Sequence, residues 1–210
     1  MIRGSLFVLE SIEAAGKGTA TTYMKEHFEK CGIPVLFTRE IGGTPYAEAI
    51  REIMLDMSKD YPNVPTVSDL LIAYAARIEH TQNVIIPALE NGVHVFSERY
   101  YASTLAYQSI ECPETRAVHD LISGYLVKPD LTILLNISPE TSVRRMRESR
   151  TDVGIELDKF ELKSLDYFRA VHKAYHQQID DTWHIVDAEK SIPEVKQQLC
   201  GNLNKFLGIP

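Results

Sequence analysis

Five short runs of apolar residues recur along the chain, and they constrain its fold more than any other feature. They lie at residues 6–9, 34–38, 93–96, 131–135 and 184–186. Each run is nearly continuous rather than alternating, which is typical of strands buried on both faces of a parallel sheet. The intervening stretches carry helical periodicity, most clearly at 19–30, 46–57, 68–86, 161–178 and 192–207, and Pro87 is expected to interrupt the third of them. Because strand and helix alternate, the sequence predicts an α/β fold with a parallel sheet.

Length and composition favour a single domain over residues 1–210. The chain is 44% apolar and 24% charged, which is ordinary for a globular protein. Cys31, Cys112 and Cys200 are far apart and form no C-x-x-C pair, so we expect neither a disulfide framework nor a zinc knuckle. No apolar run approaches the ~18 residues of a membrane span, and the run near the N-terminus is too short for a signal peptide. We therefore expect a cytoplasmic protein without a membrane partner.

The net charge of −7 argues against a protein that coats nucleic acid. It does not argue against a local cationic pocket, because net charge says nothing about where the charges lie. Eight of the eleven arginines fall in the candidate site or lid described below, namely Arg39, Arg51, Arg77, Arg99, Arg144, Arg145, Arg147 and Arg150.

The turn after the first apolar run carries the most informative motif. The P-loop pattern G-x-x-x-x-G-K-[ST] matches at Gly16 and Lys17, whereas Ser11 stands at the first glycine and Gly18 at the hydroxyl position. Backbone N–H groups and a helix dipole at such a turn suit an anion, and Lys17 can bridge nucleotide phosphates. The simpler alternative is an ordinary turn with a solvated lysine. The ATP-binding candidates are Ala14, Ala15, Gly16, Lys17, Gly18 and Thr19.

Further motifs resemble those of the thymidylate kinase family. They occur in the same order as in that family and span about residues 7–187. They are T-R-E-I-G-G-T at 38–44, with isoleucine for the family's proline, Y-A-A-R at 74–77, S-E-R-Y at 97–100, S-T-L-A-Y-Q at 103–108 and P-D-L-T at 129–132. The resemblance implies a three-layer P-loop fold with a five-stranded parallel sheet flanked by helices and a helical lid at about 144–160. It also implies transfer of the ATP γ-phosphoryl group to dTMP, with Mg²⁺, by a homodimer.

Phosphoryl transfer needs mainly positioning and charge neutralisation, which suits arginine. The resemblance implies that Glu13 meets the acceptor's 3′-hydroxyl or a metal-bound water, that Arg51 and Arg99 clamp the acceptor phosphate, that Arg77 contacts the pyrimidine edge and that Tyr107 packs below the deoxyribose. The catalytic candidates are Lys17, Arg99, Glu98, Glu13, Arg147 and Arg150. The acceptor-binding candidates are Glu13, Arg39, Glu40, Arg51, Ala73, Arg77, Arg99, Ser103, Thr104, Tyr107 and Gln108.

The lid and the metal ligands carry departures from the family. Lys159 stands where the family has an arginine, which keeps the charge but loses the planar fork. Ala14 stands where some members carry an arginine, and members without it supply one from the lid. Gly18 lacks the usual hydroxyl ligand, so the metal candidates are Thr19, Glu98, which replaces aspartate, and Glu40. The lid candidates are Arg144, Arg145, Arg147, Arg150 and Lys159.

Two features leave the function open at this point. Ala73 occupies the position at which the family usually stacks a phenylalanine on thymine, so one hypothesis is a modified or different deoxynucleotide acceptor. The changes at Ser11, Gly18 and Glu98 allow a second, a nucleotide-binding regulator with impaired catalysis.

His172 and His176 have the i, i+4 spacing of helical metal ligands, but no third ligand accompanies them, and we expect solvated histidines.

Overall fold

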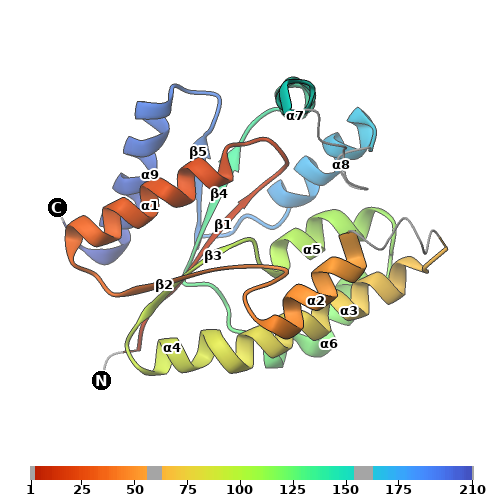
Figure 1. The fold of residues 1–210 in the computed structure, drawn as a ribbon, viewed down its shortest axis with the longest axis horizontal. Helices are drawn as coiled ribbons and strands as arrows, with labels where there is room; N and C mark the ends of the chain where they lie inside the picture. The colour runs from red at the N-terminus through yellow and green to blue at the C-terminus, as the bar shows by residue number, and fades with distance from the viewer. Residues whose placement is uncertain (1–2, 56–62, 154–162, 210) are drawn as a thin grey trace.

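The computed structural model describes residues 3–55, 63–153 and 163–209 (Figure 1). Its five strands form one sheet in the order β2-β3-β1-β4-β5, and all four neighbouring pairs are parallel. The strands are β1 (Leu6–Ser11), β2 (Val35–Arg39), β3 (His94–Glu98), β4 (Leu131–Asn136) and β5 (Trp183–Asp187). The five apolar runs therefore mark the strands to within about two residues, and the predicted fold class is confirmed.

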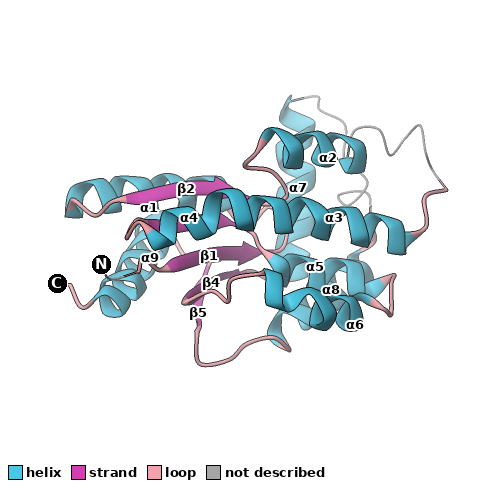
Figure 2. Cartoon of the chain, turned by 90° about the horizontal axis from the view of Figure 1, so that it is seen from below, coloured by secondary structure: helices cyan, strands magenta, loops and turns pink. Residues whose placement is uncertain are grey.

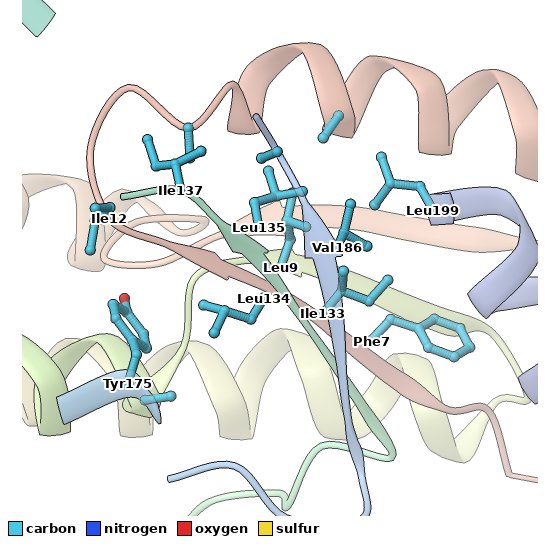
Figure 3. Packing of buried hydrophobic residues seen from close by; sticks show 14 of the residues in the cluster. Phe7, Leu9, Ile12, Ile133, Leu134, Leu135, Ile137, Tyr175, Val186 and Leu199 are labelled. Atoms are coloured by element: carbon cyan, nitrogen blue, oxygen red, sulfur yellow. The ribbon is translucent and has the colours of Figure 1, made fainter. Parts of the chain in front are cut away.

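Helices cover both faces of the sheet, which makes the three predicted layers (Figures 1 and 2). Helices α1 (Lys17–Cys31) and α9 (Ile192–Leu207) lie together over one face. Phe7 and Leu9 of β1 pack there with residues such as Leu199 of α9 (Figure 3). The alternate residues Leu6 and Val8 pack on the other face. The strands are buried on both sides, which explains their continuous hydrophobicity.

The second face and the carboxyl edge of the sheet are covered by the remaining helices, of which α5 and α6 were not predicted individually. They are α2 (Pro45–Leu55), α3 (Thr66–His80), α4 (Ile86–Glu90), α5 (Tyr101–Tyr107), α6 (Thr115–Ile122), α7 (Pro139–Val153) and α8 (Leu165–His176), with short 3₁₀ turns at Gln108–Ile110 and Ser123–Tyr125.

Pro87 does not end its helix, contrary to the sequence-based expectation. A π-helical turn at Thr81–Ile85 joins α3 directly to α4, and Pro87 lies in the first turn of α4. In this π-helical turn the Ile86 N–H bonds the Thr81 carbonyl, which shifts the hydrogen-bond pattern by one residue just before Pro87, and the helix continues past a residue that has no N–H.

No helix among the described residues is long and apolar enough to cross a membrane.

Candidate active site

A cavity of about 160 Å³ opens beside the carboxyl ends of β1, β2 and β3. Ligands of open α/β sheets bind at this edge. Nine of the eleven acceptor-binding candidates line the cavity, although they come from segments nearly 100 residues apart. They are Glu13, Glu40, Arg51, Arg77, Arg99, Ser103, Thr104, Tyr107 and Gln108, and Ile41, Met54 and Leu55 add an apolar part to the wall.

Arg77 of α3 is held rigidly at the base of the cavity. Its side chain is only 2% exposed, and Nε donates to Glu40 Oε2 while Nη1 donates to Thr104 Oγ1 at 3.0 Å. The other oxygen of Glu40 pairs with His80 Nδ1 at 2.9 Å, and His80 Nε2 meets Thr38 Oγ1 at 2.7 Å. A buried guanidinium needs such partners, so this network fixes the direction of Arg77 before any ligand is bound.

The turn that follows β2 brings Glu40 and Arg51 together. The Glu40–Ile41 peptide bond is cis, and Arg51 Nη1 donates to the Ile41 carbonyl at 3.1 Å. Gly43 has φ +85°, and a Cβ there would lie 2.5 Å from both His80 Nε2 and Thr38 Oγ1. Only glycine lets the backbone of the turn lie this close to His80 and Thr38, which accounts for the second glycine of the T-R-E-I-G-G-T motif.

Arg99 follows β3 in a left-handed conformation (φ +68°) and is the most highly connected cation of the cavity. Its Nη1 donates to the Ser11 carbonyl at 3.0 Å, to Ser103 Oγ at 3.0 Å and to Tyr175 OH at 3.3 Å. Its Nη2 pairs with Glu13 Oε1 at 3.0 Å. The guanidinium thus lies between the phosphate-loop motif and α5.

Glu13 and Tyr107 complete the same arrangement. Tyr107 OH donates to Glu13 Oε2 at 2.5 Å, and the Arg99 guanidinium lies 5.3 Å from the centre of the Tyr107 ring. Burial and the adjacent Glu13 carboxylate raise the pKa of Tyr107 well above its usual value, so the hydroxyl remains a proton donor.

Glu10 positions α5 and was missed by the sequence analysis. This fully buried carboxylate accepts from the Tyr100 and Ser103 backbone N–H groups at 2.8 and 3.2 Å, and from Ser103 Oγ at 2.7 Å. Tyr175 OH of α8 donates to it at 2.9 Å. Burial raises the pKa of Glu10, against the opposing effect of Arg99. Glu10 and Tyr175 therefore tie β1, α5 and α8 together beneath Arg99.

Two acceptor-binding candidates are not brought to the cavity wall. Arg39 is exposed and forms a bidentate pair with Glu48 of α2, with distances of 2.8 and 3.2 Å. Ala73 is fully buried beneath α2, where it packs with Ile50 and Met54. Met54 lines the cavity and Ala73 does not.

The phosphate-loop motif connects β1 to α1 as predicted. Gly16 is left-handed (φ +89°), as is Ala14 (φ +54°). Lys17 Nζ donates to Ser11 Oγ at 2.9 Å and, more weakly, to the Ile12 carbonyl at 3.4 Å. Ser11 therefore supplies a partner that a glycine could not. Burial and the nearby Arg99 charge lower the pKa of Lys17 to about 8.

The metal candidates differ in what their side chains already contact. Both Glu40 oxygens are engaged by Arg77 and His80, as described above. Thr19 is exposed, whereas Glu98 lies half-buried at the end of β3 with the Thr21 hydroxyl 3.4 Å from its Oε2. A Cβ added at Gly18 would meet no described atom within 4 Å. Of the two carboxylates, Glu98 has the weaker described contact, and hard divalent cations prefer oxygen ligands of this kind.

The described lid candidates extend from α7. Arg144 and Arg147 are exposed, while Arg145 Nη1 donates to the Ala188 carbonyl at 3.2 Å and ties α7 to the loop after β5. The side chain of Arg150 and the whole of Lys159 lie outside the described residues.

Comparison with known proteins agrees with these motifs. The family model described as Thymidylate kinase matches residues 9–199. The thymidylate kinase of Neisseria gonorrhoeae (strain NCCP11945) is 34% identical over 214 aligned residues, which cover 99% of this chain and 100% of that protein. The thymidylate kinase of Francisella tularensis subsp. tularensis (strain SCHU S4 / Schu 4) is 35% identical over 211 residues, 97% of each chain.

Proposed function

Because the chain belongs to the thymidylate kinase family, we propose that it transfers the γ-phosphoryl group of ATP to dTMP, giving dTDP and ADP. The observation that carries this proposal is the single cavity in which nine acceptor-binding candidates meet. Such a reaction requires two anions to be brought together, and the cavity opens beside the phosphate-loop motif from which Glu13 extends.

The cavity offers a different chemistry to each part of dTMP. Arg51 and Arg99 can hold the acceptor phosphate with charge-assisted hydrogen bonds, the strongest type available to a protein. Arg77 presents a guanidinium of fixed direction to the base edge, beside Thr104 and Gln108. We assign the deoxyribose to the Tyr107 and Glu13 end of the cavity.

The donor nucleotide is assigned to the N-terminal end of α1. Backbone N–H groups of the Gly16–Thr19 turn and the helix dipole attract phosphates there, and Lys17 can leave Ser11 to bridge the β- and γ-phosphates. We propose that Glu98, with waters, holds the Mg²⁺, which supplies neutralising charge at these phosphates. Arg147 and the other lid arginines would exclude water from the transferred group when the lid covers it.

We further propose that the chain acts as a homodimer in the cytoplasm, with nucleotides and not nucleic acids as its partners. Large apolar side chains on α3, on α6 and just after α6 are exposed, namely Leu71 at 52%, Leu121 at 82% and Tyr125 at 59%. Helices α3 and α6 are neighbours, since Leu70 and Tyr74 pack with Val118 and Ile122. An exposed apolar face of this kind supports a subunit interface.

Neither alternative from the sequence gains support. Ala73 does not face the cavity, so its small size does not by itself enlarge the acceptor site. A nucleotide sensor without catalysis would have no use for the acceptor arginines, and these are present and fixed.

A coupled assay of ADP release tests the proposal. With Mg·ATP present, turnover should depend on a deoxynucleoside monophosphate and be fastest with dTMP in a panel that includes dUMP, dCMP and dAMP. Lys17→Met is the control that should abolish acceptor-dependent turnover. ADP release that ignores dTMP would contradict the proposed reaction, and a faster reaction with another member of the panel would contradict the assigned base.

A further inference from the structure

Helix α8 and the end of β4 bring two imidazoles and one amide to a single point. His172 Nε2 lies 2.9 Å from Asn136 Oδ1, His176 Nε2 lies 3.0 Å from the same oxygen, and the two Nε2 atoms are 3.2 Å apart. The third polar group, which the sequence did not reveal, comes from a residue 36 positions away from His172. All three side chains are half-buried.

The triangle has the size of a metal coordination face. Zinc–nitrogen bonds of 2.0–2.1 Å at a tetrahedral angle place two ligand nitrogens about 3.3–3.4 Å apart. The observed nitrogen–nitrogen separation of 3.2 Å is close to that value, and the nitrogen–oxygen edges of 2.9 and 3.0 Å would lengthen by a few tenths of an ångström around an ion. Two N–H groups can instead share one amide oxygen, and the experiment below separates this arrangement from a metal site.

The surroundings hold the triangle in place. The Asn136 backbone carbonyl accepts from Ala188 N at 2.9 Å, which anchors the end of β4. Glu140 lies in the first turn of α7, shortly after the end of β4. Its Oε1 is paired with Arg169 Nη2 at 2.8 Å. Three protein ligands with an open fourth position are typical of zinc sites that keep a water.

We propose that His172, His176 and Asn136 Oδ1 bind one divalent transition-metal ion of the Zn²⁺ or Ni²⁺ class. Imidazole ligands favour these ions over Mg²⁺ and Ca²⁺, which prefer oxygen. The site is separate from the acceptor cavity, because none of its three residues lines that cavity. A bound ion would clamp α8 to β4, and α8 carries Tyr175, whose hydroxyl contacts Arg99, Ser103 and Glu10.

Isothermal titration of the untagged, nucleotide-free full chain with ZnCl₂ or NiCl₂ alone tests the site at pH 7.5, where an ordinary imidazole is neutral. We expect one ion per chain, and the wild-type Tm should rise by roughly 5–10 °C at about one hundred times the Kd. MgCl₂ should produce neither effect. His172→Ala and His176→Ala should each weaken binding at least about tenfold, while Asn136→Asp should tighten it by adding a charged oxygen ligand.

His27→Ala is the matched comparison, because His27 forms the other i, i+4 pair of this type. Its Nε2 lies 3.8 Å from Cys31 Sγ and 2.6 Å from Asn204 Oδ1, so this variant separates binding at α8 from binding at that second group. This variant should bind the ion as the wild type does. Equal titrations for the wild type and His172→Ala/His176→Ala, with circular dichroism showing that both are folded, would overturn the proposal. So would loss of binding in His27→Ala alone. The outcome does not depend on whether the chain phosphorylates dTMP.

Discussion

The two halves of the proposed active site are built differently. On the acceptor side, the cations are fixed in place by the protein itself, through Glu40 for Arg77, the Ile41 carbonyl for Arg51 and Glu13 for Arg99. On the donor side, the N-terminal turn of α1 is open, and Arg144 and Arg147 are exposed. The acceptor cations are thus held in place before the ligand arrives, whereas on the donor side Lys17 is held by Ser11 and the Arg144 and Arg147 side chains are exposed.

This difference follows from burial. A buried guanidinium must have partners whether or not substrate is bound, because an unpaired charge in the interior costs several kcal/mol. An exposed cation is hydrated by water, so it does not need a protein partner before phosphate binds. Departures from the usual motifs occur on both sides, at Ser11, Gly18 and Glu98 near the donor and at Ile41 and Ala73 near the acceptor.

The largest expected effect comes from the cation that joins the two halves. Arg99→Ala should lower kcat at least about 10³-fold, because arginines that stabilise the charge of a transferred phosphoryl group contribute on this scale. Steady-state kinetics with dTMP and Mg·ATP measure the loss. Arg3→Ala, an arginine that lies before β1 and 3.9 Å from Asp130, should retain wild-type kinetics as the control. If Arg99→Ala lowered kcat by less than about tenfold, Arg99 would not act on the transferred phosphoryl group.

Two carboxylates that flank the same turn make a matched pair of variants. Glu40→Gln should destabilise the fold by about 3 kcal/mol, because it breaks a buried pair and leaves Arg77 without its charge partner. Glu48→Gln removes an equally well-formed pair whose side chains are 55% and 40% exposed, and it should cost under about 1 kcal/mol. Urea unfolding followed by circular dichroism gives both values. Equal losses would contradict the contrast between a fixed interior and a solvated edge.

A smaller effect concerns pH on the donor side. With a pKa of about 8, Lys17 loses its proton above that pH in the free enzyme and no longer attracts phosphate. The value of kcat/KM for ATP should therefore fall about tenfold per pH unit above pH 8. The value of kcat/KM for dTMP at saturating ATP should not fall in this way, because bound phosphates keep Lys17 protonated. If kcat/KM fell equally for ATP and for dTMP above pH 8, the pH dependence would not come from deprotonation of Lys17 on the donor side.

The sequence predicted the sheet well because buried parallel strands are continuous apolar runs, a local signal. It did not predict α5, which begins where Glu10 accepts from the Tyr100 and Ser103 N–H groups. That contact joins residues 90 or more positions apart and leaves no local pattern. The expected helix end at Pro87 was wrong, because a π-helical turn, which has no clear sequence pattern, lets α3 continue into α4.

The site shows the same division. Motif positions such as Arg51 and Arg77 lie in the cavity as expected, because the motifs fix both residue type and place in the fold. Three supporting residues were missed, because each acts through contacts between distant segments. His80 holds Glu40 beneath Arg77, and Glu10 and Tyr175 position α5 and Arg99. Ala73 was expected beside the base of the acceptor, but it lies beneath Met54. Its position depends on how α2 packs on α3, and residue spacing along one helix does not reveal that packing.

The most direct test of a prebuilt acceptor side is the binding of dTMP without the donor. Isothermal titration should be carried out on the nucleotide-free chain and again on the chain saturated with a non-hydrolysable ATP analogue. A cavity that is already formed carries no conformational penalty, so the two dissociation constants for dTMP should agree within about threefold. Binding of dTMP that is detected only when the analogue is present would contradict the account, because it would mean that the donor side builds the acceptor site.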